Sequence, residues 1–360
     1  MKLSKLSQFW STHQPKKYLN QPLSTAIRFD APEGIMPWPT SFWKKAALAL
    51  PRLSSYPNPS ANKLKQKLAR LLNLDQVQLS LAAGSDEIID NLTRLMLDPH
   101  DEVIVVNPIF FRFADASLRQ GAIVNDIDTA AKNGFEVDQA IVQKVTTKAK
   151  TAKIIWLCSP NNPTGKTIRP SFLKDILEST SATVILDQTH EFPWSHNHLD
   201  LLQRSDRLIL LRSFSKTCGL PGLRLGFAIG SKQLIQTLES WRLPFNLNAL
   251  THTIGQQVLQ KENRKFVEAT VFQIVKNTRQ LAKKVSLLPG ITCVPNPSTN
   301  LLLIKHRHKN LYQELLENDI VTTNLNHLES IKNQHFVRIT TSTQAKSRLI
   351  FQKLSEICLR

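Results

Sequence analysis

The chain has 360 residues, enough to bury a large core and to form two domains. Its 46 lysines and arginines exceed its 28 aspartates and glutamates, and the net charge of +18 is compatible with an anionic substrate, but the basic residues are scattered and predict no specific nucleic-acid binding. No apolar run of about 20 residues occurs and four widely spaced cysteines form no C-x-x-C pair, so we expect a cytoplasmic protein without a membrane span, a disulfide framework or a metal site.

The N-terminal part of the chain alternates helical spacing with short apolar runs. Residues 1–40 mix proline, polar and aromatic residues and predict an irregular arm. Beyond the arm we expect helices at 41–50, 61–72, 83–97 and 137–148, and strands at 78–82, 101–106, 122–127, 153–157, 184–187, 208–211 and 225–229. Helices interleaved with apolar strands favour a mostly parallel sheet with helices on both faces.

The C-terminal part predicts a second, smaller domain. The helices expected at 233–241 and 251–260 still lie within the large domain. The expected elements of the small domain are helices at 263–287, 311–317 and from 344 onward, and strands at 291–294, 300–305 and 336–340. We therefore expect three parts. They are an arm at 1–40 that also contributes to the small domain, a large domain at 41–262 and a small α+β domain at 263–360.

The segment 208–230, LILLRSFSKTCGLPGLRLGFAIG, carries a polar cluster between two apolar runs. Ser213, Ser215 and Arg224 provide two hydroxyls and a guanidinium, which suit a phosphate group. Lys216 lies among them, and a lysine held beside other cations in a partly dry site becomes a nucleophile toward aldehydes. The cluster predicts a Schiff base with a phosphorylated aldehyde, pyridoxal phosphate. The alternative is an ordinary surface loop.

Two further stretches predict ligand chemistry. Ser85 and Asp86 lie in AGSDE, where small residues precede a helix whose first backbone N–H groups suit a phosphate. Either residue also suits a helix cap. Asp187 ends the apolar run VILD, and in open α/β sheets ligands bind at the carboxyl ends of the strands.

Taken together, VILDQTH, SPNNPTG and SFSKTCGLPGLRLGF resemble the fold-type I pyridoxal-phosphate enzymes, most closely the histidinol-phosphate aminotransferase branch. The resemblance runs from about Tyr56 to Arg338, with the motifs in the family's order. It implies an α/β fold, in which a large domain with a mostly parallel seven-stranded sheet and helices on both faces is joined to a small α+β C-terminal domain. It also implies pyridoxal 5'-phosphate as the cofactor.

The resemblance implies two catalytic residues and a homodimer. Lys216 would bind the cofactor and then move a proton as general base and acid. Asp187 would face the pyridine nitrogen and keep it protonated, so that the ring accepts electrons. Tyr56, in SSYPNPS, would reach the cofactor phosphate of the neighbouring subunit. As an alternative, Tyr56 packs against a proline-rich turn.

Further cofactor contacts follow from the same motifs. Asn162, directly before Pro163, would donate to the ring oxygen. Phe110 replaces the commoner tyrosine that stacks on the ring, which keeps the π face and loses the phenol. His190 replaces a tyrosine that donates to the ring oxygen; an imidazole can also donate but titrates near neutral pH, and the alternative is a packed loop residue. The residues that would hold the phosphate are Ser85, Asp86, Ser213, Ser215 and Arg224.

Substrate recognition is implied at two places. Arg338, in HFVRITTST, would bind the α-carboxylate of the substrate, because its planar guanidinium suits a carboxylate. Arg348 suits a solvated helix face instead. Residues 27–39 lie where the family has its N-terminal substrate loop, and within them residues 30–33, DAPE, only approximate the usual sequence. Similarly, residues 187–190, DQTH, depart from the usual D-E-A-Y.

The expected reaction is ping-pong transfer of an amino group between an amino acid or amino-alcohol phosphate and a 2-oxo acid. A decarboxylase of the phosphothreonine type or an oxidase of the same fold are the alternatives, and both would retain Lys216, Asp187 and Arg224. A noncatalytic DNA-binding protein on this fold would need an added winged-helix module, for which the chain has no room. The sequence alone does not distinguish the amino donors.

Overall fold

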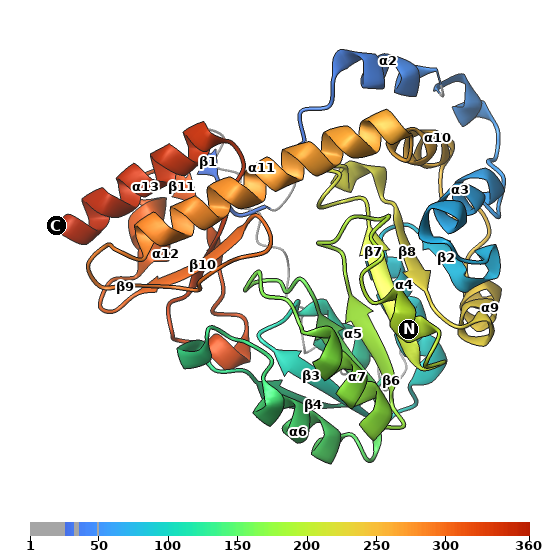
Figure 1. The fold of residues 1–360 in the computed structure, drawn as a ribbon, viewed down its shortest axis with the longest axis horizontal. Coiled ribbons are helices and arrows are strands. Elements are labelled where there is room, and N and C mark those ends of the chain that lie inside the picture. Colours follow the sequence, from blue (N-terminus) through green and yellow to red (C-terminus); the bar gives the residue numbers. More distant parts are fainter. Residues whose placement is uncertain (1–25, 32–35, 49) are drawn as a thin grey trace, which may run out of the picture.

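The computed structural model describes residues 26–31, 36–48 and 50–360. Its main feature is a seven-stranded sheet with the strand order β2-β8-β7-β6-β5-β3-β4 (Figure 1). Neighbouring strands from β7 to β4 are parallel, whereas β8 is antiparallel to β2 and β7, so the predicted mostly parallel sheet is confirmed. The strands are β2 (Leu79–Ala82), β3 (Glu102–Asn107), β4 (Ile123–Asp128), β5 (Ala152–Cys158), β6 (Thr183–Asp187), β7 (Leu208–Ser213) and β8 (Gly226–Ile229).

Alternating apolar side chains on these strands form two cores, one on each face of the sheet. On β5, Ile155 and Leu157 enter the first core, whereas Ile154 and Trp156 enter the second. Because both faces are buried, the strands have almost continuous apolar sequences. The first face is covered by α2 (Thr40–Ala47), α3 (Asn62–Leu72), α6 (Gln139–Lys148), α7 (Pro170–Ser179), α8 (Leu199–Leu202) and α10 (Ala249–Val258), and the second by α4 (Ser85–Met96), α5 (Arg112–Leu118) and α9 (Lys232–Trp241).

A smaller antiparallel sheet has the order β12-β13-β10-β9. Its strands are β9 (Ile291–Cys293), β10 (Leu301–His306), β12 (Thr323–Asn324) and β13 (Val337–Thr340). The helices α11 (Lys261–Val285) and α13 (Gln344–Leu359) lie side by side over it, with α12 (Leu311–Leu316) nearby (Figure 1). Since α11 also contributes Val267 to the first core of the large sheet, this helix joins the two parts of the molecule.

Some elements differ from the sequence expectations. Within the stretch expected to be irregular, β1 (Ile27–Arg28) pairs in parallel with β11 (Ile320–Val321). Two-residue strands carry no readable period, so only the fold reveals them. The helices α5 and α7 were not expected; α7 begins at Pro170, which suits the first turn of a helix because that N–H needs no partner.

The helix expected at 41–50 is shorter, because α2 ends at Ala47 and a 3-10 turn follows at Leu50–Ser54, around Pro51. Pro32 and Glu33, from the expected substrate loop, lie outside the described residues. Over the described part of the chain, no helix combines the length and apolar composition needed to cross a bilayer.

Candidate active site

The carboxyl ends of β5, β6 and β7 meet at one edge of the large sheet, as parallel neighbours must. Register pairs Cys158 with Asp187, and β7 ends in the same region at Ser213. The turn that carries Lys216 follows directly, and Lys216 is half-buried there. The sheet therefore gathers the predicted lysine and carboxylate at the edge where ligands bind in this class of fold.

Asp187 is the most deeply buried carboxylate at this edge, with 4% of its surface exposed. Its Oδ1 accepts a hydrogen bond from the amide of Thr189 at 2.8 Å, and its Oδ2 lies 3.8 Å from the thiol of Cys158. Burial raises the pKa of Asp187 from 3.8 to about 6, although the Thr189 amide favours the ionised form. Within the described residues no salt bridge reaches this carboxylate, so it suits a cation supplied by a ligand.

His190 lies three residues beyond Asp187 and is 7% exposed. Burial, together with the charges of Lys216 and Arg338, lowers the pKa of His190 from 6.5 to about 3. Lys216 and Arg338 therefore both lie close enough to His190 to influence it. The imidazole stays neutral at physiological pH, so the expectation that it titrates near neutrality is wrong, because the sequence does not reveal burial.

Arg338, from the small sheet, and Asn162, from the turn after β5 of the large sheet, meet at the site. Arg338, on β13, donates through Nη1 to Oδ1 of Asn162 at 2.7 Å and through Nη2 to Oγ1 of Thr323 at 2.9 Å. This guanidinium is 8% exposed. With Oδ1 of Asn162 occupied as an acceptor, its amide nitrogen faces away from Arg338 and is oriented to donate. Arg348, which was expected on a solvated helix face, is exposed on α13.

The expected phosphate contacts surround the first turn of α4. The preceding residue, Gly84, has φ of +90° and provides no side-chain cap, so the helix begins with uncapped backbone N–H groups at Ser85 and Asp86. Arg224 approaches this turn, with its Nη2 at 3.6 Å from Oδ2 of Asp86 and 3.3 Å from the Ala83 carbonyl oxygen. The Asp86 side chain is thus an ion-pair partner, and of Asp86 only the backbone N–H suits an anion.

Ser213 and Ser215 form a buried hydroxyl pair at the end of β7. Ser213 Oγ donates to Ser215 Oγ at 2.9 Å and accepts from the Ser215 amide at 3.0 Å. Opposite, β8 approaches α4 closely at Gly226. A Cβ at Gly226 would lie 2.6 Å from the carbonyl carbon of Gly84 and from the amide nitrogen of Ser85. Only glycine at 226 allows the strand to hold the start of the helix in this place.

The two expected aromatic contacts differ in setting. Phe110 is half-buried beside the second core, and its ring packs edge-on against Phe111 and Phe113. Tyr56 is 84% exposed, and its ring lies 4.8 Å from that of Phe245. Phe110 is held by packing within the chain, whereas Tyr56 projects into solvent.

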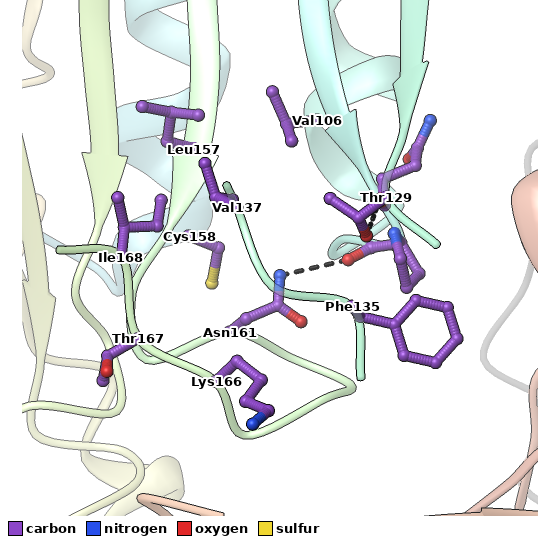
Figure 2. Close-up of a pocket in the computed structure, with 12 residues that line it drawn as sticks. Val106, Thr129, Phe135, Val137, Leu157, Cys158, Asn161, Lys166, Thr167 and Ile168 are labelled. Carbon is purple, nitrogen blue, oxygen red and sulfur yellow. Dashed lines mark hydrogen bonds between the residues drawn. The ribbon is translucent and has the colours of Figure 1, made fainter. Parts of the chain in front are cut away.

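A small cavity of about 20 Å³ lies beside the site, between the ends of β3 and β5 (Figure 2). Figure 2 shows Asn161 on one side of it, where its Nδ2 donates to the Pro108 carbonyl oxygen at 3.0 Å. This bond ties the SPNNPTG turn to the turn before Phe110. The peptide bonds before Pro108, Pro160 and Pro163 are cis. The cavity has room for about one water molecule and is far too small for a pyridine ring.

Sequence reasoning missed several residues around this edge. Thr189 and Cys158 contact Asp187 directly. Arg212, at 0% exposure, bonds to the loop that follows Asp187. The one available signal was a charged residue in an otherwise apolar strand, LILLRS, because a buried charge requires partners.

Three features fit pyridoxal phosphate. The buried carboxyl of Asp187 has no cationic partner within the described residues. The first turn of α4 has uncapped N–H groups and lies beside Arg224, and the half-buried Lys216 lies at the same sheet edge as Asp187. The carboxyl suits a protonated ring nitrogen, the helix start with Arg224 suits a phosphate, and the lysine suits an aldehyde. The residues present therefore fit the cofactor.

Comparison with known proteins agrees with this arrangement. A model of the family described as aminotransferase class I and II matches residues 30–354. The chain is 30% identical over 309 residues to the histidinol-phosphate aminotransferase of Thermoanaerobacter pseudethanolicus, which covers 86% of both proteins. The family match thus spans the large sheet, the small sheet and every site residue discussed above.

Two solved structures have the same fold. The histidinol-phosphate aminotransferase from Clostridium acetobutylicum has a TM-score of 0.81 at 19% identity, covering 92% of this chain and 98% of that one. The L-threonine-O-3-phosphate decarboxylase from Porphyromonas gingivalis has a TM-score of 0.79 at 20% identity, covering 93% and 100%. Because the two named activities share one fold, the structural likeness does not choose between them. The sequence matches do, and the chain belongs to the class I and II aminotransferases, which are pyridoxal-phosphate-dependent transaminases.

Proposed function

We propose that the chain is an aminotransferase of the histidinol-phosphate type, moving an amino group between an amino acid or amino-alcohol phosphate and a 2-oxo acid. Its support is the 30% identity to a named histidinol-phosphate aminotransferase over 86% of the chain. The observation that carries the proposal is the buried carboxyl of Asp187, without a cation among the described residues, at the sheet edge that also holds Lys216.

The residues proposed to hold the cofactor form two groups. Lys216 would bind its aldehyde, Asp187 would face its ring nitrogen, and Phe110, Asn162 and His190 would contact the ring. When bound, pyridoxal phosphate supplies a ring that withdraws electrons and stabilises negative charge at the substrate's Cα. The phosphate would be held by Ser85, Asp86, Ser213, Ser215 and Arg224, with Tyr56 from a second copy.

Lys216 is proposed to move the proton. Once the incoming amine has displaced Lys216, the lysine Nζ would take the proton from the substrate's Cα. It would then give this proton to the cofactor carbon that receives the amino group. Asp187 must be ionised for this chemistry, and a cation placed against it lowers the pKa of a buried carboxyl. Because Asp187 is buried with no cation beside it in the described part of the chain, it suits a protonated ring nitrogen.

Arg338 is proposed to bind the anionic group of the substrate. It lies on β13, in the small sheet, and donates to Asn162, in the turn after β5 of the large sheet. A substrate anion on this guanidinium would therefore lie beside the amide proposed to contact the cofactor ring. Bidentate pairing with the planar fork orients the substrate as well as holding it.

We also propose a homodimer in which Tyr56 completes the site of the other subunit. Large apolar side chains are exposed in the two segments that carry Tyr56 and Phe245, whose rings contact each other, and exposed apolar side chains suit burial between two copies. They are Leu50 and Leu53 before Tyr56, and Trp241 and Leu243 before Phe245.

The proposed compartment is the cytoplasm. All four cysteines are free thiols in the structure, and three of them are buried. Free thiols are the usual state in a reducing compartment.

The proposal is tested by offering histidinol phosphate and 2-oxoglutarate to protein loaded with pyridoxal phosphate. We expect glutamate to form, and Lys216→Ala to lower the rate by at least about 10³-fold. The control is Lys232→Ala, which changes an exposed lysine on α9 and leaves the rate unchanged. Release of CO₂ or peroxide without glutamate would instead identify a decarboxylase or an oxidase.

A further inference from the structure

Arg212 is a fully buried arginine at the carboxyl end of β7. None of its surface is exposed, and burial lowers the pKa of its guanidinium to about 10. Side chains alternate along a strand, so Arg212 and the next residue, Ser213, point to opposite faces of the sheet. Arg212 therefore lies on the far side of the sheet from the hydroxyls proposed to hold the phosphate, and the mechanism above does not use it.

The guanidinium bonds to the loop that follows Asp187. Its Nε and Nη2 donate to Oε1 of Gln188 at 3.2 and 3.0 Å, and Nη2 also donates to the Asn197 carbonyl oxygen at 3.2 Å. Its Nη1 donates to the carbonyl oxygens of Pro193 at 3.4 Å and of Ser195. One side chain thus contacts the loop at its beginning, middle and end.

The partners of this buried charge are neutral. Within the described residues no salt bridge reaches Arg212, although the charge of Glu191, in the same loop, favours the charged guanidinium. Gln188 occupies the position of the glutamate in the D-E-A-Y segment usual for the family. A buried charge without a carboxylate is stable only if hydrogen-bond acceptors surround it, so the loop must keep the conformation that presents them.

The same loop carries groups of the proposed site. Its second and third residues are Thr189, whose amide bonds to Asp187, and the buried His190. Gln188 extends the network, because its Nε2 donates to the Asn197 carbonyl oxygen and lies 2.9 Å from Nδ1 of His198. The beginning and the end of the loop are thereby joined through the Gln188 side chain.

We propose that Arg212 is a positioning residue, which fixes the loop from Gln188 to His198 and so holds the Thr189 amide on Asp187 and the imidazole of His190 at the site. This inference rests on the proposed function of that site. It assigns no contact between Arg212 and the substrate or cofactor. Its effect passes entirely through the loop.

Hydrogen–deuterium exchange of the cofactor-free protein tests the loop directly. Arg212→Lys keeps the positive charge and removes the planar guanidinium with its several donors. We expect it to raise amide exchange in peptides from residues 189–198 by at least about tenfold. Gln188→Leu removes the shared acceptor and is expected to do the same if Arg212→Lys does not fold. Gln188→Glu supplies a carboxylate and is expected to keep the wild-type protection.

The matched control is Arg207→Lys. Arg207 lies just before the opposite end of β7 and also donates to backbone carbonyl oxygens, including that of Leu177 at 2.9 Å. Its substitution should lower thermal stability without raising exchange in the loop. Unchanged exchange in the loop of both Arg212→Lys and Gln188→Leu would overturn the inference, as would an equal rise in Arg207→Lys.

A second measurement separates this inference from the proposed function. With pyridoxal phosphate added, Arg212→Lys should shift the pH midpoint of the protein's visible absorbance, whereas Arg207→Lys should not. Wild-type protein that gives no such absorbance would contradict the proposed function, and the exchange result would still decide the role of Arg212 in the loop. Matching midpoints in wild type and Arg212→Lys would show that the loop does not position the site.

Discussion

The two ends of the proposed cofactor site are built in different ways. The ring end, Asp187 and His190, is 4% and 7% exposed, and burial sets the protonation of both groups. At the phosphate end, the side chains of Asp86 and Arg224 are 45% and 47% exposed, and backbone placement dominates. Substitutions at the ring end should therefore change charge and pH dependence, whereas substitutions at the phosphate end should change position and affinity.

The largest expected effect is on catalysis at the ring end. Asp187→Asn keeps the shape and the acceptor for the Thr189 amide but removes the charge, so we expect kcat for transamination to fall by about 10²–10³-fold, the scale for loss of one electrostatic group. Steady-state assays with glutamate as donor measure it. Asp206→Asn, at an exposed aspartate, is the control. A full rate in Asp187→Asn would contradict the role of the carboxylate.

The same substitution should stabilise the cofactor-free protein at high pH. Because the pKa of Asp187 is raised from 3.8 to about 6, the folded wild type loses stability as the pH rises through that interval. The loss is about 3 kcal/mol at pH 8, and Asp187→Asn does not suffer it. Urea unfolding at pH 4 and pH 8 should show no gain at the lower pH and the full gain at the higher.

The phosphate end is tested by its closest backbone approach. Gly226→Ala would place a Cβ 2.6 Å from the backbone of Gly84 and Ser85, so we expect a loss of about 1–3 kcal/mol in the free energy of unfolding. Affinity for inorganic phosphate should fall with it. Gly222→Ala is the control, since its Cβ meets no atom within 4 Å. Equal stability of the two variants would mean that β8 does not hold the helix in place.

His190 gives the opposite pH dependence to Asp187. Its pKa is about 3 in the folded protein and 6.5 in the unfolded chain, so wild type loses stability as the pH falls below 6.5. His190→Gln removes this loss, and between pH 8 and pH 5 the variant should gain about 2 kcal/mol relative to wild type. Unfolding at the two pH values measures the gain. The exposed His308→Gln should give none.

The sequence predicted the features that depend on neighbouring residues and missed those that depend on the folded chain. Apolar runs predicted the strands β5, β6 and β7, and motif order predicted the family, because both are local properties of the chain. The pairing of β1 with β11 and the contacts of Arg212 join segments that are far apart in the sequence. No local sequence pattern predicts such contacts. The neutrality of His190 depends on burial by the folded chain, and residue type alone suggested the reverse.

The smallest effect on stability is expected at Arg224. Its ion pair with Asp86 is half-exposed, and exposed pairs contribute at most about 1 kcal/mol, so Arg224→Gln should unfold almost as wild type does. Its affinity for pyridoxal phosphate should nevertheless fall by about tenfold or more, because a charged hydrogen bond to the phosphate is lost. Affinity for pyridoxal, which lacks the phosphate, should not change. Arg348→Gln removes an exposed arginine on α13, and equal affinities in the two variants would mean that the phosphate binds elsewhere.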